Sequence, residues 1–212
     1  MSTKIIILDF DGTLGDTTDV IIRTTQAAIK ELGLPSRTDA ECAAMIGLRL
    51  VEIPPVLFPG LEVDCDLYAQ TYRRIFNILN TPGAVTLYPH VLETLKELKS
   101  RGLTLTIASS RSNNSLKEYI DNLALASTIT YILGGNDVSN GKPHPEAVNM
   151  TLERFGYKPE EAIVVGDTVF DIHMGRNAGT RTCGVSYGNG TRETLSDATW
   201  IIDDFSDLLE LV

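Results

Sequence analysis

The stretch Ile5-Ile6-Ile7-Leu8-Asp9-Phe10-Asp11-Gly12-Thr13-Leu14 decides the fold. Its apolar run is typical of a strand buried on both faces of a parallel sheet, and it ends in two aspartates. Open α/β sheets bind ligands at the carboxyl ends of their strands, so Asp9 and Asp11 stand where chemistry is expected. Gly12 allows a sharp turn beside a ligand. Alone, an Asp-x-Asp pair is more often two surface aspartates, so its meaning depends on the rest of the chain.

The composition is that of an ordinary globular protein, with 212 residues, 43% hydrophobic and 22% charged. A net charge of −10 argues against nucleic acid or an anionic membrane as a partner, because both attract basic surfaces. No apolar run approaches the roughly 18 residues of a membrane span, and we expect neither a membrane segment nor a signal peptide. Three scattered cysteines suggest neither a disulfide framework nor a zinc site, so we expect reduced thiols and a cytoplasmic location.

From residue 103 onward, short apolar runs alternate with amphipathic stretches, which indicates a parallel sheet with helices on both faces. The expected strands are Leu103–Ala108, Tyr131–Leu133, Ala162–Val165, Thr182–Val185 and Thr199–Ile202. The expected helices are Pro89–Arg101, Asn113–Leu123, Pro145–Phe155, Asp171–Asn177 and Phe205–Leu211. We therefore predict an α/β, Rossmann-like parallel sheet core.

Residues 15–85 break this rhythm, because they contain no convincing strand. Residues 16–32 carry a helical apolar stripe, and Tyr68, Tyr72, Ile75, Phe76 and Leu79 repeat at helical spacing. A helical module inserted directly after the aspartates would lie over them. We predict a catalytic core of residues 1–14 and 86–212, with residues 15–85 as an inserted α-helical cap domain.

Three more polar motifs stand at or just beyond predicted strand ends. Residues 107–111 end a strand in Ser109 and Ser110, residues 141–145 hold Lys142 between a glycine and two prolines, and residues 163–171 end a strand in Gly-Asp-Thr-Val-Phe-Asp. Each motif alone is weak, since paired serines at a helix start are usually a cap. In this order along one sheet edge, their coincidence by chance is improbable.

The set resembles the haloacid dehalogenase superfamily, in particular its helical-cap phosphatases of the phosphoglycolate-phosphatase group. The resemblance rests on Asp-Phe-Asp-Gly-Thr-Leu at 9–14, Ile-Gly at 46–47, Gly-Lys-Pro-x-Pro at 141–145, Gly-Asp-x-x-x-Asp at 166–171 and Asn-Ala-Gly at 177–179. It implies a Rossmann-like core, Mg²⁺ as cofactor, an aspartyl-phosphate intermediate and a small phosphorylated metabolite as substrate, in a monomer or homodimer.

Charge balance agrees with the roles that this resemblance implies. Asp9 is the candidate nucleophile, but at about 4 Å and an effective dielectric near 20 each like-charge pair with phosphate costs roughly 4 kcal/mol. Two cations are therefore needed. Asp9 and Asp167, with the backbone carbonyl of Asp11, would hold Mg²⁺, a hard ion that prefers oxygen ligands, and Lys142 would supply the second charge.

The remaining predicted contacts surround the phosphate. Ser109, Ser110 or the neighbouring N–H groups at the helix start would bind phosphate oxygens, and Gly12 and Thr13 would complete the first loop. Asp171 would position Lys142 or a water bound to the metal, and the sequence does not decide whether it touches the metal directly or through water.

Asp11 separates branches of the superfamily, because a leaving alkoxide needs a proton and the attacking water must lose one. Dehalogenase relatives expel halide and lack this aspartate. Phosphonatase relatives use a cap lysine, and Lys30 does not match that context. Phosphosugar mutases use a cap histidine, which residues 15–85 lack. Hydrolysis is preferred; a phosphosugar mutase and a catalytically idle binding module remain as alternatives.

Within the cap, residues 46–49 are the expected substrate-facing segment. Gly47 permits close backbone approach, and Arg49 offers a positive fork for a carboxylate or second phosphate. An ion pair of Arg49 with Glu52 is an equally good expectation. Phosphoglycolate phosphatases often have proline where this chain has Arg49, which puts phosphoglycolate itself in doubt.

Overall fold

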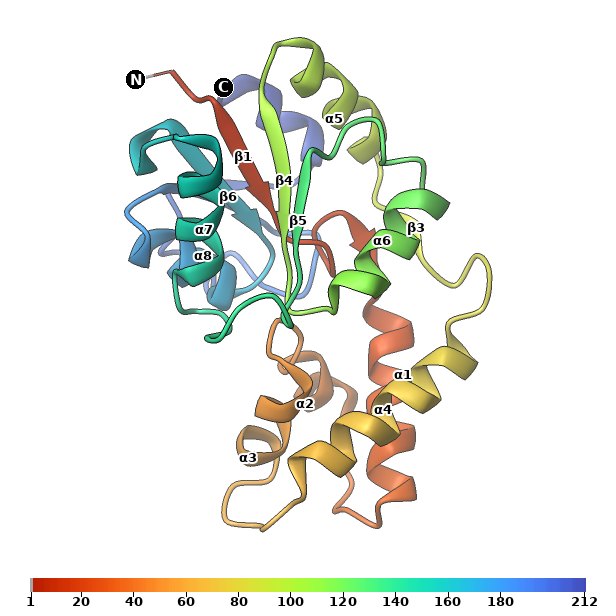
Figure 1. Ribbon diagram of the computed structural model, residues 1–212. Coiled ribbons are helices and arrows are strands. Elements are labelled where there is room, and N and C mark those ends of the chain that lie inside the picture. The colour runs from red at the N-terminus through yellow and green to blue at the C-terminus, as the bar shows by residue number, and fades with distance from the viewer. Residues whose placement is uncertain (1) are drawn as a thin grey trace.

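A computed structural model describes residues 2–212 and shows a central sheet of parallel strands in the order β5-β4-β1-β6-β7-β8 (Figure 1). The strands of this sheet are β1 (Ile5–Leu8), β4 (Thr104–Ala108), β5 (Tyr131–Leu133), β6 (Ala162–Gly166), β7 (Arg181–Val185) and β8 (Trp200–Ile202). Strand β1 lies in the middle, with Ile5 opposite Thr104 on one side and Ala162 on the other. The predicted α/β fold class is confirmed, and each predicted strand lies within one residue of an observed one.

Helices cover both faces of this sheet, which explains why β1 is apolar throughout (Figure 1). The helices are α5 (Val91–Ser100), α6 (Asn113–Asn122), α7 (Glu146–Phe155), α8 (Val169–Asn177), and the 3₁₀ segments η2 (Pro159–Glu161) and η3 (Phe205–Glu210). The last predicted helix is thus a 3₁₀ segment. Ile6 and Leu8 belong to the core cluster on the side of α5 and α6, and Ile5 and Ile7 belong to the cluster on the side of α7 and α8.

The chain between β1 and α5 forms a helical region beyond the carboxyl ends of the strands (Figure 1). It contains α1 (Thr18–Glu31), α2 (Asp39–Ala43), η1 (Leu50–Glu52), α3 (Ile53–Leu57) and α4 (Cys65–Leu79). Helices α1 and α4 pack against each other, and the predicted stripe of α4 is buried from Tyr68 to Phe76. The polar ends are capped: Thr38 starts α2 with a capping box, and the side chain of Asp64 accepts from Leu67 N at the start of α4.

A short antiparallel pair joins this helical region to the sheet. Strand β2 (Gly15–Asp16) pairs with β3 (Thr86–Leu87), Gly15 opposite Leu87 and Asp16 opposite Thr86. The expectation that residues 15–85 contain no strand is therefore wrong at its first two residues. Two residues are too few for a strand period to show in the sequence.

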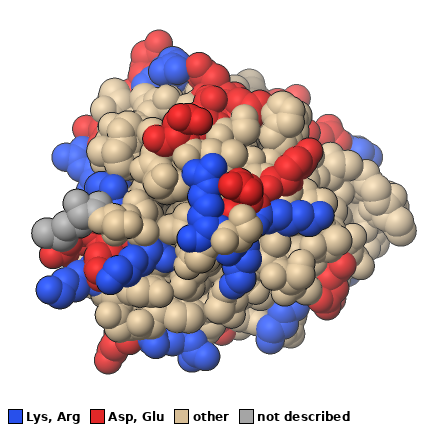
Figure 2. Space-filling view, turned by 90° about the horizontal axis from the view of Figure 1, so that it is seen from above, with Lys and Arg blue, Asp and Glu red and all other residues tan. Residues whose placement is uncertain are grey.

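Charge is mixed on the face away from the helical region. Figure 2 views this face, and Lys and Arg side chains lie there among Asp and Glu side chains rather than in a separate basic patch. Among residues 2–212, no helix is both long and apolar enough to cross a membrane.

Candidate active site

Asp9 follows β1 at the carboxyl edge of the sheet, and its side chain is buried. Its backbone N–H donates to the carbonyl of Val165 on β6. Asp9 is therefore hydrogen-bonded to the sheet although it lies one residue beyond the end of β1. The ammonium group of Lys142 donates to Oδ1 of Asp9 at 2.5 Å. These two residues are 133 positions apart in the sequence, and the parallel sheet brings them together.

Lys142 also donates to Oδ1 of Asp171, at 2.6 Å. The other carboxylate oxygen of Asp171 accepts from the backbone N–H and the hydroxyl of Thr168, at 3.1 and 2.6 Å. These bonds cap the start of α8, so the helix itself orients the carboxylate. The predicted contact between Asp171 and Lys142 is present in the structure.

Asp167 follows β6 and is fully buried. Its Oδ1 accepts from the hydroxyl of Thr13 at 3.2 Å, and its Oδ2 accepts from the backbone N–H and side-chain amide of Asn189, each at 2.8 Å. Gly12, with a φ of +83°, approaches so closely that a Cβ there would lie 2.1 Å from Oδ2 of Asp167. The first loop therefore closes on Asp167, and Gly12 is required for that contact.

Three carboxylates, those of Asp9, Asp167 and Asp171, have oxygens within 4.8 Å of one another. Burial raises the pKa of Asp9 well above its usual range against the opposing pull of Lys142, and burial together with Asp171 raises the pKa of Asp167 to about 7. Burial also acts against the charge of Lys142, but Asp171 and Asp9 outweigh it and raise the pKa of the ammonium group. If all three carboxylates lost their protons, the cluster would carry more negative charge than Lys142 alone balances.

Asp11 has a different partner. Arg111 donates from Nη2 to Oδ1 of Asp11 at 2.6 Å and from Nε to Oδ2 at 3.1 Å. The guanidinium carbon lies 4.8 Å from the ring centroid of Phe76 on α4 and 5.0 Å from that of Tyr119 on α6. Arg111 is thus held between the helical region and the sheet domain, with its fork on Asp11.

The other predicted residues lie around the same edge. Ser109 is buried beside the end of β4, and its hydroxyl accepts from the N–H of Arg111 at 3.3 Å. The hydroxyl of Ser110 donates to the carbonyl of Gly47 at 2.6 Å, which joins the sheet domain to the helical region. Arg49 is paired with Glu52 at 2.5 Å and donates to the carbonyl of Ser139 at 2.9 Å. Its role as a reader of substrate stays a prediction.

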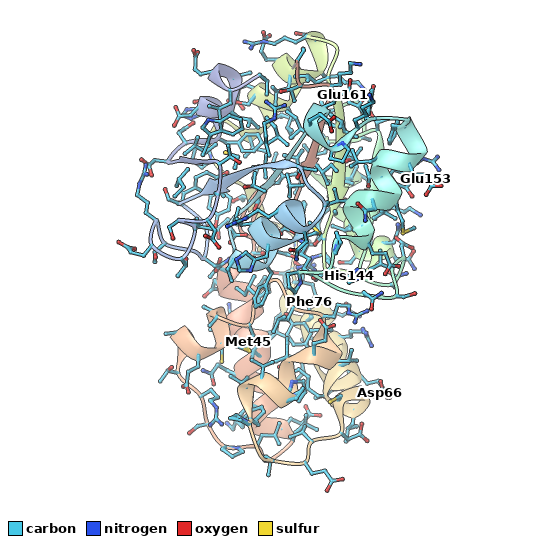
Figure 3. The ribbon with its side chains drawn as sticks, turned by 90° about the vertical axis from the view of Figure 1, so that its left-hand side faces the viewer. Met45, Asp66, Phe76, His144, Glu153 and Glu161 are labelled. Atoms are coloured by element: carbon cyan, nitrogen blue, oxygen red, sulfur yellow. The ribbon has the colours of Figure 1, made fainter. Side chains whose placement is uncertain are left out.

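A cavity of about 470 Å³ opens between the sheet edge and the helical region. Its polar end includes Asp9, Asp11, Ser109 and Arg111, and its apolar lining comes from α1, α4 and the segment around Ile46. Figure 3 shows Phe76 and Met45 where the helical region meets the sheet domain. A phosphorylated small molecule placed here would meet the polar end with its phosphate and the apolar lining with the rest.

Sequence reasoning missed two residues of this site. Asn189 lies in a loop beyond β7, and the only sequence signal for it was the pair of glycines on either side, Gly188 and Gly190. A Cβ at Gly188 would lie 2.3 Å from the carbonyl oxygen of Gly12, and a Cβ at Gly190 would lie 2.2 Å from that of Asp167. Arg111 stands directly after the paired serines, but the sequence does not reveal that its guanidinium reaches Asp11.

Comparison with known proteins agrees with this geometry. The model of the haloacid dehalogenase-like hydrolase family matches residues 6–185. A pyrophosphatase PpaX of Bacillus pumilus is 33% identical over 98% of this chain and 95% of its own length. A phosphoglycolate phosphatase of Aquifex aeolicus is 34% identical over 87% of this chain and 85% of its own length.

Similarity in structure extends along the whole chain. A crystal structure of a haloacid dehalogenase-like hydrolase from Bacteroides fragilis superimposes with a TM-score of 0.91 at 26% identity, covering 98% of this chain and 100% of that one. The resemblance inferred from the motifs is confirmed, as is the expected hydrolase class. The chain belongs to the haloacid dehalogenase-like hydrolase family.

Proposed function

We propose that the protein is a Mg²⁺-dependent phosphatase that hydrolyses a small phosphorylated metabolite through an aspartyl-phosphate on Asp9. The observation that carries the proposal is the position of Asp9: buried at the carboxyl end of β1, 2.5 Å from the ammonium group of Lys142. An isolated surface aspartate would have neither the burial nor the cation. The pyrophosphatase and phosphoglycolate phosphatase relatives support the same reaction type.

The donor set fits a divalent cation. With all three carboxylates ionised, one ammonium group would leave two negative charges unbalanced in a buried space, and a divalent ion would supply that charge. All the candidate ligands are oxygens, which suits Mg²⁺. Asp9 and Asp167, with the backbone carbonyl of Asp11, are our proposed ligands, while Asp171 holds Lys142. When bound, the ion offsets the charge of the phosphoryl group as it approaches Asp9.

In the first step, a carboxylate oxygen of Asp9 attacks phosphorus, a bond forms between them, and the bond from phosphorus to the leaving oxygen breaks. Asp11 donates a proton to the leaving alkoxide. Lys142 stays within hydrogen-bond reach of Asp9 and balances the charge that gathers there. Ser109, which is buried beside the end of β4, and the backbone N–H groups after β4 would donate hydrogen bonds to the phosphoryl oxygens.

In the second step, Asp11 takes a proton from a water molecule, whose oxygen attacks phosphorus. The bond between phosphorus and Asp9 breaks, which releases inorganic phosphate and restores the carboxylate. The proton on Asp11 then serves the next turnover. One carboxyl group thus acts as acid and base in turn.

We propose residues 15–85 as a cap that covers this chemistry, with the cavity between cap and core as the substrate site. Gly12 and Thr13 shape the loop beside the phosphate through their contacts with Asp167. We propose a cytoplasmic location, because three scattered cysteines are typical of a protein with reduced thiols.

The experiment is an assay of phosphate release from p-nitrophenyl phosphate, with Mg²⁺ and with a chelator, followed by a screen of phosphorylated metabolites. We expect Mg²⁺-dependent release that Asp9→Asn abolishes. A sugar-phosphate isomer as the product instead of free phosphate would support the mutase alternative. Absence of any turnover with every phosphate ester, despite Mg²⁺ binding, would support the idle binding module.

A further inference from the structure

The cavity has two sides of different chemistry. Every residue that the sheet domain contributes to its lining is polar, charged or glycine, whereas most of those from the helical region are apolar. Figure 3 shows Met45 and Phe76 of the helical region at this junction. The main apolar side chains of that side are Ile21, Met45, Ile46, Leu48, Ile53 and Phe76. A phosphate ester with its phosphate beside Asp9 would therefore have its leaving group among apolar side chains.

The arginines of the lining offer that leaving group little positive charge. Arg111 is paired with Asp11 at 2.6 Å, and Arg49 is paired with Glu52 at 2.5 Å. Arg73 is exposed, so water screens its charge. A carboxylate or second phosphate on the apolar side would lose its hydration without gaining a free cation, which is costly. The lining therefore disfavours a charged leaving group.

The size of the cavity agrees with this reading. Its volume of about 470 Å³ lies in the range of roughly 300–1,000 Å³ that is typical of sites for whole organic ligands. A leaving group of two carbons, such as the glycolate of phosphoglycolate, would leave much of the apolar lining in contact with water. A larger apolar group would cover that surface, and its burial would favour binding.

Tyr72 adds one polar group to the apolar side. It lines the cavity and is only 7% exposed, yet its hydroxyl has no hydrogen-bond partner among residues 2–212. Its ring lies 6.0 Å from that of Phe76 and 6.5 Å from that of Tyr68, so packing along α4 fixes its position. A buried hydroxyl without a partner is costly, and a ligand that supplies one removes this cost.

We propose that the substrate is a phosphate monoester of an uncharged, mainly apolar alcohol, which lies among the apolar side chains of the helical region and meets the hydroxyl of Tyr72 with one further polar group. This inference rests on the proposed phosphatase function and names its substrate class. A leaving group with a carboxylate or phosphate that Arg49 reads is the opposite outcome in the tests that follow.

The first test uses wild type and the series ethyl, butyl and hexyl phosphate, in which the leaving alcohols have nearly the same intrinsic reactivity. We expect kcat/KM to rise about fourfold for each added methylene that is buried, so that hexyl phosphate exceeds ethyl phosphate by roughly 10²-fold. Propyl phosphate should also exceed 2-phosphoglycolate, of which it is an uncharged near-isostere. No rise with chain length, or a preference for 2-phosphoglycolate, would overturn the inference.

The second test uses Ile21→Gln, with Ile22→Gln as the matched control. Both residues are half-buried on α1, but only Ile21 lines the cavity. Ile21→Gln should lower the ratio of kcat/KM for hexyl over ethyl phosphate by about 10-fold, because it removes apolar surface from the subsite. Ile22→Gln should keep the ratio. An equal ratio in the two variants would overturn the apolar subsite. Ile21→Ala replaces the glutamine variant if that protein does not fold, with the same expectation.

The third test uses Tyr72→Phe, with Tyr68→Phe as the matched control. Tyr68 lies one turn away on the same helix and also has a buried hydroxyl without a partner, but it does not line the cavity. The substrates are hexyl phosphate and its isomers with one hydroxyl on the chain. For the isomer that wild type uses best, Tyr72→Phe should lower the ratio of kcat/KM over hexyl phosphate by about 3- to 10-fold. Tyr68→Phe should keep that ratio, and the same ratio in both variants would exclude the role of Tyr72.

Binding separates a failure of this inference from a failure of the proposed function. Ethyl-, butyl- and hexylphosphonate lack the ester bond and cannot be hydrolysed, so calorimetry with wild type and Mg²⁺ measures binding alone. Affinity should rise with chain length, and Ile21→Gln should reduce that rise. Tighter binding of the longer phosphonates without turnover of any ester would refute the phosphatase and keep the apolar subsite. Turnover with equal affinity for all three phosphonates would refute the subsite and keep the phosphatase.

Discussion

The ammonium group of Lys142 lies between two carboxylates, 2.5 Å from Oδ1 of Asp9 and 2.6 Å from Oδ1 of Asp171. One cation therefore serves both the proposed nucleophile and the carboxylate that caps α8. Because Asp171 is fixed by the helix start, Lys142 has a defined position before any substrate arrives.

Replacing Asp9 by Asn keeps the size of the side chain and removes the attacking charge. We expect phosphate release to fall by far more than 10²-fold, because loss of a covalent nucleophile ordinarily costs more than that. Thermal unfolding should show that the fold is intact. Asp121→Asn, at an exposed position of α6, is the control and should keep full activity. Activity of Asp9→Asn above about a hundredth of wild type would assign the nucleophile wrongly.

Lys142→Ala should lower kcat by about 10²- to 10³-fold even at saturating Mg²⁺, because the carboxylate cluster loses a cation that the metal does not replace. Asp167→Ala should instead raise the Mg²⁺ concentration needed for half-maximal activity. Titration of Mg²⁺ against both variants separates the two effects, and exposed Lys117→Ala is the control. Rescue of Lys142→Ala but not of Asp167→Ala by Mg²⁺ would mean that the two roles are reversed.

The contribution of Asp167 to the stability of the metal-free protein should fall as the pH rises from about 4 to about 7. Asp167 has a pKa raised to about 7 in the folded protein, whereas an unfolded aspartate ionises near 4. Between these values the folded state binds the extra proton, so the free energy of unfolding contributed by Asp167 decreases with pH. Melting curves of wild type and Asp167→Asn in a chelator isolate this contribution, since Asn does not titrate.

Addition of Mg²⁺ should reverse that loss. Protons and the ion compete for the same carboxylates, so the rise in Tm on adding Mg²⁺ should be larger at pH 8 than at pH 5. The same Tm shift at both pH values would contradict a metal site built on Asp9 and Asp167.

Gly12→Ala should destabilise the protein more than Gly83→Ala does. Both glycines have a φ of +83°, so each alanine meets the same left-handed backbone penalty of about 1–2 kcal/mol. At Gly83 nothing lies within 4 Å of the added Cβ, whereas at Gly12 it would meet Asp167 and Asn189. The clash should add about 1–3 kcal/mol and disturb the site. Urea unfolding and Mg²⁺ affinity measure both effects, and equal values for the two variants would mean that the loop adapts.

The sequence predicted the fold and the residues that meet at the sheet edge better than it predicted side-chain partners. Asp9, Ser109 and Asp167 each follow the end of a strand, and parallel strands end at one edge of the sheet, so the sequence alone predicts that these residues lie together. The hydrogen-bond partner of a long side chain cannot be predicted in this way. Arg49 and Arg111 both precede or begin helical segments near the cavity, and only their rotamers decide that one meets Glu52 and the other Asp11.

The sequence pattern also does not predict which loop residues outside the motifs reach the site. Asn189 contacts Asp167 through a turn whose geometry depends on Gly188 and Gly190, and no periodicity marks such a turn. The pairing of β2 with β3 was missed for a similar reason, since two residues carry no strand period.

That short pairing has a mechanical consequence. The two segments that connect the helical region to the sheet domain are hydrogen-bonded to each other, and Tyr88 N–H donates to the carbonyl of Leu14 just outside the pair. The helical region is therefore connected to the sheet domain by one two-stranded ribbon, β2 and β3, rather than by two separate chain segments. A ribbon bends and twists far more readily than its strands slide, so a movement of the proposed cap would carry its helices as a unit and return them to the same register over Asp9.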